Sequence, residues 1–406
     1  MAGTAVVVGG GSGGLAAAIG LRRVGWEVTV VERSSTLEDA GAGISLAANG
    51  LRALDELGVG EAVREAARGQ YTGGTRTPDG AWLTRMDGAV LEQAVGTPIM
   101  GIPRAALHRL LREALPAAAL LTGSDVRSVR QITPRAVHVA CADTVLDADL
   151  VVAADGIGSK VRSLLFPAHP GPVHSGSAVL RAITEQAVDL RTDFELTWGH
   201  GAEFGHIAFH DGRAEWHAVL DLPAGTRFAD PVAELRRRFR TWHEPIPALL
   251  DATLPTAVLQ HDVHELRTPL PSYTVGRIAL LGDAAHAMTP NLGQGACQAL
   301  EDAVTLAAAL AAEPTVDAAL ALYDAERRPR SQAVARAARQ AGRMGHRLSH
   351  PLAVAVRNTV MRLTPSGAAT RMILRHHDWT PPHLNGCAPR PENERSGASG
   401  QQPPQL

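Results

Sequence analysis

A glycine-rich turn near the start of this chain has the spacing of a nucleotide-binding loop. Gly9, Gly11 and Gly14 follow a strand-like run at residues 4–8 and precede a helix-like segment. Gly9 permits a tight turn, Gly11 lets the backbone approach a pyrophosphate, and Gly14 lets helix pack on strand. Glu32 ends the next apolar run, where it can accept hydrogen bonds from ribose hydroxyls. The predicted nucleotide contacts in this part are Gly9, Gly11, Ser12, Gly13, Gly14 and Glu32.

A second such turn lies within residues 276–310. An apolar run at 278–281 predicts a buried strand, Asp283 follows it, and helical periodicity begins near Gln294. A carboxylate at the end of a buried strand can accept hydrogen bonds from a polyhydroxy cofactor, and the free N–H groups of a helix start favour an anion. Taken alone, this segment is equally compatible with a plain strand-to-helix turn.

Three more polar residues occupy comparable positions. Asp155 follows a buried strand at 149–154, and ligands of open α/β sheets bind at the carboxyl ends of strands. Arg104 lies in the first turn of a predicted helix, where a cation opposes the helix dipole and suits a phosphate or carboxylate ligand. Ser45, in a glycine-containing stretch, can hydrogen-bond a cofactor. An ordinary turn and a solvated arginine are the alternatives for the first two.

The elements that must position these residues alternate in type. Strands and helices alternate over the first part of the chain, whereas period-2 alternation predicts an antiparallel sheet across residues 173–273. Residues 70–96 resemble an excursion into that second unit. Helices are predicted at 316–328, 329–347 and 352–363, and the tail at 385–406, rich in Pro, Gly, Ser and Gln, is predicted to be disordered.

Composition excludes several classes of function. The chain of 406 residues has room for two domains, and its net charge of −2 gives no reason to expect nucleic acid. Three widely spaced cysteines match neither a disulfide framework nor a metal site, which predicts a reducing, cytoplasmic location. No apolar run approaches the roughly 18 residues of a membrane helix, and a fold that begins by residue 4 leaves no space for a signal peptide.

Two features bear on partners. Eleven arginines and no acid lie within residues 327–377. Such a run can bind lipid or an acidic partner, but a solvated outer face is favoured for helices whose leucines and valines pack inward. In the predicted sheet, Phe204, His206 and Trp216 are weak candidates for the wall of a substrate pocket, although each histidine is more simply a packed or surface residue.

Three ordered blocks together resemble the single-component FAD-dependent monooxygenases, the para-hydroxybenzoate hydroxylase-like enzymes. The blocks are the glycine turn with Glu32-Arg33, residues 155–162, and residues 282–295. The likeness extends to about residue 384. The sequence departs from the family pattern at Ala48, where proline is common, and at Cys297, where asparagine is frequent; neither change affects the expectation of flavin binding.

This resemblance implies roles for particular residues around non-covalently bound FAD. Arg33 lies near the adenine, Val126 meets it through the backbone, and Arg104 with Asp283 reaches the ribityl-pyrophosphate portion. The helix start faces the flavin pyrimidine ring, Pro290 faces the flavin, and the block at Asp155 serves both nucleotides. The residues implied at that helix start are Gly293, Gln294, Gly295, Ala296 and Cys297.

The implied fold is α/β, with a Rossmann-like FAD-binding domain, an interleaved antiparallel-sheet substrate domain and C-terminal helices. Residues 1–70, 100–172 and 274–384 are assigned to the FAD-binding domain with the C-terminal helices. Residues 71–99 and 173–273 are assigned to the substrate domain.

The implied activity uses NAD(P)H and O2 to hydroxylate or epoxidise an electron-rich aromatic or olefinic small molecule through a flavin C4a-hydroperoxide. The flavin carries the chemistry, so no acid–base triad is required. Residues 199–210 contain no arginine that could anchor a small anion, which favours a neutral substrate, as in secondary metabolism. The alternatives are another flavin-dependent oxidoreductase, such as a dehydrogenase or oxidase, and a non-catalytic flavin-bearing interaction protein.

Overall fold

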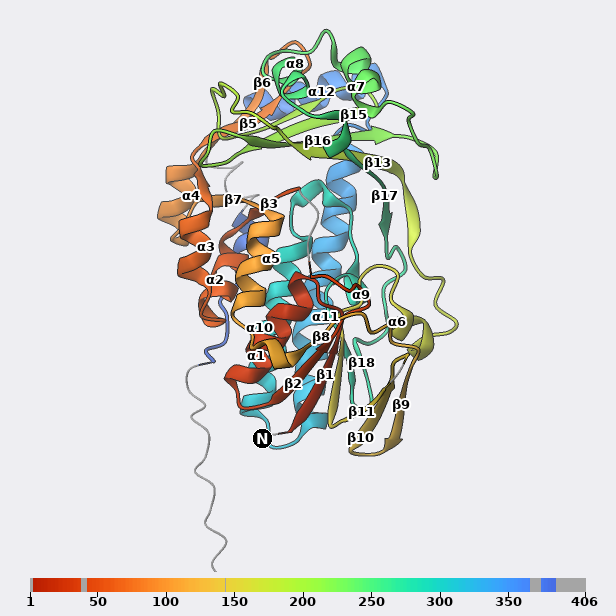
Figure 1. Cartoon of the computed structure of the whole chain (residues 1–406). Helices are drawn as coiled ribbons and strands as arrows, with labels where there is room; N and C mark the ends of the chain where they lie inside the picture. The colour runs from red at the N-terminus through yellow and green to blue at the C-terminus, as the bar shows by residue number, and fades with distance from the viewer. Residues whose placement is uncertain (1–2, 38–41, 143, 366–373, 385–406) are drawn as a thin grey trace, which may run out of the picture.

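A six-stranded sheet forms the base of the molecule (Figure 1). The computed structural model describes residues 3–37, 42–142, 144–365 and 374–384. The strand order is β18-β19-β12-β1-β2-β8, and every neighbouring pair is parallel except β18 with β19. The strands are β1 (Thr4–Val8), β2 (Glu27–Val31), β8 (Leu120–Leu121), β12 (Leu150–Ala153), β18 (Thr274–Val275) and β19 (Ile278–Leu280).

The helices of this part pack closely because small residues line their contacts. Gly20 of α1 (Ser12–Arg23) faces Ala307 of α10 (Gly295–Ala312), so a side chain at Gly20 would crowd that helix. Both helices bury their apolar residues in one core with the central strands. The other helices here are α2 (Ala48–Glu56), α3 (Gly60–Ala66), α5 (Arg104–Glu113), α6 (Lys160–Leu165), α9 (Asp283–His286) and the 3-10 turn η1 (Ala117–Ala119).

Two small three-stranded sheets accompany the main one. One has the order β11-β10-β9, and the other, β3-β7-β4, lies where the chain passes towards the second unit. Val126 lies just before β9. The strands are β3 (Gly43–Leu46), β4 (Arg68–Gln70), β7 (Ile99–Pro103), β9 (Ser128–Thr133), β10 (Ala136–Ala140) and β11 (Val145–Ala148).

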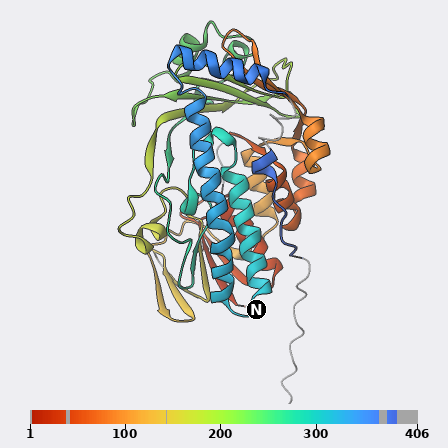
Figure 2. The same cartoon turned by 180° about the vertical axis from the view of Figure 1, so that it is seen from behind.

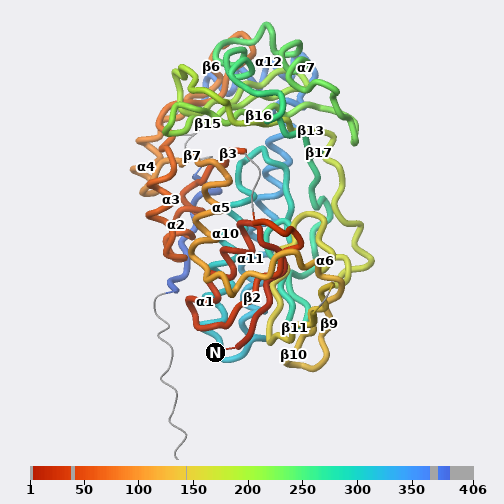
Figure 3. Tube along the Cα trace, viewed as in Figure 1, coloured from red at the N-terminus to blue at the C-terminus, as the bar shows by residue number. Residues whose placement is uncertain are grey.

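A seven-stranded sheet, β17-β13-β16-β15-β14-β5-β6, forms the opposite end of the molecule (Figures 1 and 3). Strand β5 pairs with β14 and β6 pairs with β5, so residues 72–87 belong to the same sheet as strands from residues 173–273. Its strands are β5 (Thr72–Arg76), β6 (Trp82–Asp87), β13 (Val173–Ile183), β14 (Phe194–Trp198), β15 (Ala202–Ala208), β16 (Ala214–Asp221) and β17 (Leu259–Glu265). Helix α4 (Gly88–Val95) follows β6.

The stretch predicted to be only sheet also contains two helices. They are α7 (Pro231–Phe239) and α8 (Ile246–Asp251), followed by the 3-10 turn η2 (Pro255–Ala257). The Asp230 side chain accepts a hydrogen bond from the Ala233 N–H, and this N-cap followed by Pro231 was a readable helix start. These helices cover the outer face of the sheet and complete a second apolar core.

The predicted helix boundary at Pro329 is wrong, because α11 (Val316–Met344) continues through that residue. Proline removes one helical hydrogen bond. Arg327 and Arg330, on either side of Pro329, form ion pairs with Glu301 of α10, which hold the helix in place across the interruption. The helix reaches from the six-stranded sheet to the seven-stranded sheet (Figure 2).

Helix α12 (Pro351–Leu363) lies apart from the other C-terminal helices, across the seven-stranded sheet, where it packs against β6 (Figure 2). Assigning all residues 274–384 to the nucleotide-binding part is therefore incorrect for this helix, because its contacts are with the second unit. The predicted disordered tail at 385–406 lies outside the described residues.

Candidate active site

The carboxyl ends of β1, β12 and β19 lie side by side, and we call the edge that they form with the start of α10 the trough. Gly9 has φ +108°, and a Cβ atom there would lie 2.4 Å from the Ala154 carbonyl oxygen. A Cβ at Gly14 would lie 2.0 Å from the Gly9 carbonyl oxygen, whereas one at Gly11 would meet no atom within 4 Å. Gly9 and Gly14 are thus needed for packing, and Gly11 leaves backbone accessible to a ligand.

The residues beside Gly11 differ in what they do. Gly13 brings α1 against Leu281, since a Cβ there would lie 3.0 Å from the leucine Cδ2. Ser12 Oγ is buried and has no hydrogen-bond partner within the described part of the chain. A buried hydroxyl without a partner is costly, so this atom is suited to a ligand at the helix start.

The Glu32 carboxylate holds the glycine turn in place through hydrogen bonds to backbone N–H groups. Its Oε2 accepts a hydrogen bond from the Gly10 N–H at 2.7 Å, and its Oε1 accepts from the Ser34 N–H at 2.8 Å. His108 of α5, which the sequence reasoning missed, places Nε2 2.8 Å from the Gly10 carbonyl oxygen. The Ser124 N–H donates to the Glu32 carbonyl, which brings the segment leading to Val126 beside the end of β2. Arg33 follows Glu32 directly and is exposed.

Asp155 sits at the end of β12 with one carboxylate oxygen unused. Its Oδ2 lies 3.2 Å from the Val161 N–H, while Oδ1 is buried without a partner among the described residues. Buried Arg162 donates to the Ile157 carbonyl at 2.6 Å and the Ala284 carbonyl at 3.1 Å, which ties this turn to α9. Burial lowers the pKa of Arg162, an effect that nearby Asp155 and Asp283 oppose.

Asp283 is exposed. It begins α9 directly after Gly282, whose N–H donates to Asp302 Oδ2 at 2.9 Å. The Asp283 side chain is therefore accessible to a ligand at the end of β19. A ligand there would bury it.

The start of α10 is also open. Gly293 and Gly295 have no atom within 4 Å of a Cβ placed on either, and exposed Pro290 begins the short turn η3 (Pro290–Leu292) just before them. Gln294 is buried, and Ala296 is partly buried. The N–H groups of this first turn have no helical carbonyl to bind, which suits a ligand oxygen.

Cys297 turns away from this opening. A Cβ on Gly50 of α2 would lie 2.7 Å from the Cys297 sulfur, so the thiol packs between two helices. Burial raises the pKa of Cys297 to about 11, which keeps the thiol protonated and unreactive at neutral pH. Only the backbone of Cys297 can contribute to a cofactor site.

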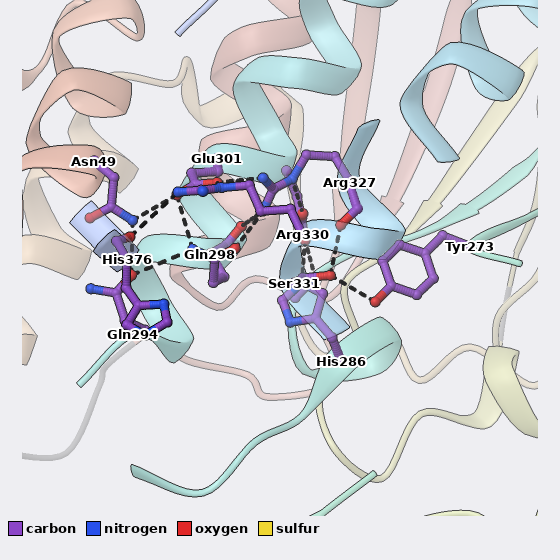
Figure 4. Close-up of polar contacts among 12 residues, drawn as sticks. Asn49, Tyr273, His286, Gln294, Gln298, Glu301, Arg327, Arg330, Ser331 and His376 are labelled. Carbon is purple, nitrogen blue, oxygen red and sulfur yellow. Dashed lines mark hydrogen bonds and ion pairs between the residues drawn. The ribbon is translucent and has the colours of Figure 1, made fainter. Parts of the chain in front are cut away.

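A buried polar network joins the α10 start to the Gly282 turn, and sequence reasoning missed it (Figure 4). Asn49 donates to Gln294 at 2.9 Å and to Glu301 at 2.7 Å. Arg327 of α11 forms ion pairs with Glu301 and Asp302, and Asp302 lies 2.6 Å from His286 Nε2. Although burial opposes ionisation, His286 and Arg327 hold the pKa of Asp302 below its usual range.

This network has one readable signal in the sequence. Two adjacent acids, Glu301 and Asp302, interrupt an otherwise apolar helix, and both are fully buried. Charged residues in such a position require partners. The positions of those partners on α11 could not be read from the sequence.

The remaining two cofactor candidates lie at the strand β7 and helix α5 junction. Ser45 of β3 pairs with Gly101 of β7. Arg104 begins α5, and its N–H donates to the Ala42 carbonyl at 2.7 Å.

The prediction that Phe204, His206 and Trp216 line a substrate pocket is wrong. Phe204 stacks on Trp216, with ring centroids 5.6 Å apart, and both belong to the core beneath α7 and α8. His206 lies on the same face of β15 as Phe204. Burial lowers the pKa of His206 to about 4. Side chains alternate between the two faces of a strand, so the residues next to Phe204 and His206 on β15 point to the inner face of the sheet. The aromatic residues mark the outer core instead.

A small cavity of about 20 Å³ lies between the inner face of this sheet and the Pro290 turn. Val219, Val263 and Pro290 contribute apolar surface. Its charged side chains are paired: Arg339 Nε lies 2.5 Å from Glu265, and Arg347 Nε lies 3.6 Å from Asp221. His346 also lines the cavity, and its ring nitrogens lie 3.7 Å from a Glu203 carboxylate oxygen and 3.4 Å from an Asp221 carboxylate oxygen.

The polar groups of the trough fit FAD. Open backbone at two glycine-rich turns, the unpartnered oxygens of Ser12 and Asp155, and an exposed carboxylate at Asp283 occur along one edge of the sheet. This arrangement suits a cofactor that combines phosphates, hydroxyls and a ring with amide-like edges.

Comparisons with known proteins agree with this reading. Residues 3–338 match a sequence family described as an FAD binding domain. The chain is 36% identical over 381 residues to an aurachin C monooxygenase/isomerase of Stigmatella aurantiaca, covering 93% of this chain and 98% of that protein. It is 33% identical over 388 residues to a 2-heptyl-3-hydroxy-4(1H)-quinolone synthase of Pseudomonas aeruginosa, covering 91% and 96%.

A solved structure shows the same fold. The crystal structure of Klebsiella pneumoniae HpxO with FAD and uric acid superposes with a TM-score of 0.85 at 26% identity, covering 92% of this chain and 96% of that one.

Proposed function

This chain belongs to the FAD binding domain family of flavin-dependent monooxygenases, and we propose that it uses NAD(P)H and O2 to oxygenate a neutral, electron-rich heteroaromatic compound. FAD, when bound, accepts hydride and activates oxygen. The chain's residues bind and orient the cofactor and exclude water from the reacting ring.

The main support for a neutral substrate is that the charged side chains of the cavity beside Pro290 are paired. Arg339, His346 and Arg347 each face a carboxylate, so the cavity offers an anion no uncompensated cation. A carboxylate substrate would have to compete with Glu265 or Asp221 for these groups. A neutral ring avoids that competition and is held by the apolar surface of Val219 and Val263.

Similarity to the quinolone synthase supports a specific first candidate. The name of that relative contains a 4(1H)-quinolone ring with an alkyl chain. We therefore propose a 2-alkyl-4(1H)-quinolone as the representative substrate. Other relatives are named for hydroxylation of benzoates, which makes benzoates the informative comparison.

The proposal is tested by substrate-stimulated oxidation of NADH and NADPH with FAD-loaded protein. We expect 2-heptyl-4(1H)-quinolone to stimulate oxidation and to gain oxygen, and 3-amino-4-hydroxybenzoate to do neither. Denaturation should release all the FAD, as expected for non-covalent binding. Stimulation by benzoates alone would contradict the neutral substrate class, and oxidation without an oxygenated product would indicate another flavin-dependent oxidoreductase.

A further inference from the structure

Helix α12 presents an apolar stripe to solvent. Leu352, Val356, Val360 and Leu363 are 72%, 64%, 58% and 77% exposed, respectively. Their spacing places them on one side of the helix. Of the twelve large apolar side chains that are exposed in the described residues, these four lie on this one helix. Four of the five leucines and valines of α12 therefore do not pack inward, and inward packing was the condition for treating the arginine-rich segment as an ordinary solvated face.

The stripe is held on a fixed helix. On the opposite side, buried Arg357 donates to the Met344 and Gly345 carbonyl oxygens at 2.9 and 2.7 Å. Its guanidinium also lies 5.2 Å from the ring centre of Trp198. Met344, at the end of α11, adds another apolar side chain that is 53% exposed.

Along the sequence, the segment that carries the stripe has charges of one sign, and Asp79 of the β5–β6 turn lies near its Arg362. Helix α12 contains two arginines and no acid, and the surrounding residues 327–377 contain eleven arginines and no Asp or Glu. Several of these arginines are paired with acids elsewhere, as Arg327 and Arg339 are, but Arg343 and Arg362 are exposed. An exposed aliphatic stripe flanked by arginine is typical of a helix that lies in the interface of an anionic membrane.

The size of the stripe distinguishes a bilayer from a second copy of the chain. A thirteen-residue helix is about 20 Å long and about 10 Å wide. This face is well below the roughly 800 Å² per partner that a stable protein interface needs. A bilayer requires no such matched area, because apolar side chains enter it individually.

We propose that α12 docks the protein reversibly on an anionic lipid surface, with Leu352, Val356, Val360 and Leu363 inserted among the lipids. Among the described residues, no helix is both long and apolar enough to cross a membrane, so the contact is peripheral. The inference is independent of the substrate proposed above.

The test is co-sedimentation of FAD-loaded protein with vesicles of equimolar phosphatidylglycerol and phosphatidylcholine, and with vesicles of phosphatidylcholine alone. We expect binding to the anionic vesicles that weakens with added salt. The double variant V356E/V360E should lower the binding constant by about tenfold or more. The matched control is V145E/I132E, which adds the same charge at apolar side chains that are 61% and 49% exposed on the small β9–β11 sheet.

FAD content and melting temperature, measured for both variants, show that each is folded. Retained binding by the control together with loss by V356E/V360E supports docking through α12. Absence of wild-type binding to anionic vesicles, or equal loss in both variants, would overturn it. So would a wild-type dimer in light scattering that V356E/V360E converts to monomer, since a second copy would then cover the stripe.

Discussion

At the scale of single residues, the trough is defined by polar atoms that the protein itself leaves unsatisfied. Ser12 Oγ and Asp155 Oδ1 are buried without partners among the described residues, and Asp283 is exposed at the end of β19. Proteins rarely leave such atoms unpaired unless a ligand or water completes them. These residues are where we place the FAD phosphates and hydroxyls.

Replacing Asp283 by alanine should weaken FAD binding. A hydrogen bond to a charged group contributes about 1.5–3 kcal/mol, or roughly ten- to 150-fold in Kd. The cofactor-free protein should keep its stability within about 0.5 kcal/mol, because the side chain is exposed. Fluorescence titration with FAD measures the effect, with D251A on α8 as the remote control. An unchanged Kd in D283A would remove Asp283 from the site.

His346 should make stability depend on pH. Burial opposes its charge, but Asp221 and Glu203 raise its pKa to about 9, above the ordinary value of 6.5. Its stabilising contribution is therefore complete below pH 6.5 and is lost as pH rises through about 9. In urea unfolding, H346Q should be about 2 kcal/mol less stable than wild type at pH 6, and the two should converge near pH 10. A difference that does not change with pH would contradict this.

At the scale of elements, α10 and α11 act as one support for two cofactor contacts. Asn49 and Glu301 fix the Gln294 turn, while Asp302 fixes the Gly282 turn. Arg327 neutralises both acids. The two ends of the trough are thereby held at a set separation by side chains that do not enter it.

Removing Arg327 should be strongly destabilising. In R327M the two buried acids lose their shared cation, which costs about 3–5 kcal/mol in the free energy of unfolding. The neighbouring Arg328 pairs with Asp324 one turn earlier and is about one-third exposed, so R328M should cost less than about 1 kcal/mol. Urea unfolding of the two variants provides the comparison. Equal losses would show that the buried network is not what joins the helices.

Adjacent residues of β16 should separate substrate choice from stability. Val219 lines the cavity beside Pro290, whereas Leu220 packs in the outer core under α7 and α8. V219A should change the ratio of kcat/KM between short and long alkyl substrates, by an amount equivalent to about 1–3 kcal/mol in transition-state binding, with FAD still bound. L220A should lower the free energy of unfolding by about 2–5 kcal/mol and leave that ratio unchanged. The reverse result would place the substrate on the other face.

The sequence was informative where local pattern decides structure. The glycine turn at Gly9 to Gly14 and the strand ends at Asp155 and Asp283 all followed from spacing and apolar runs. It failed on Phe204 and Trp216, because alternation shows that two faces exist but not which one meets the cofactor. It also failed at Pro329, where tertiary ion pairs outweigh a local helix breaker.

At the scale of the whole molecule, the two sheets lie at opposite ends (Figure 1). The parallel sheet supplies the trough, and the seven-stranded sheet covers the end at Pro290. This arrangement suits the proposed function, in which a reacting ring is held away from water and the cofactor lies on the parallel sheet. The family match across residues 3–338 spans both parts.

The measurement that tests the central claim most directly is the origin of the oxygen in the product. FAD-loaded protein is supplied with NAD(P)H, 2-heptyl-4(1H)-quinolone and ¹⁸O2 in unlabelled water, and the product is analysed by mass spectrometry. Monooxygenation predicts one ¹⁸O atom in each product molecule, and no label when ¹⁸O is supplied as water instead. Substrate-dependent consumption of NAD(P)H with no ¹⁸O in any product would contradict the assignment of this chain as a monooxygenase acting on that substrate.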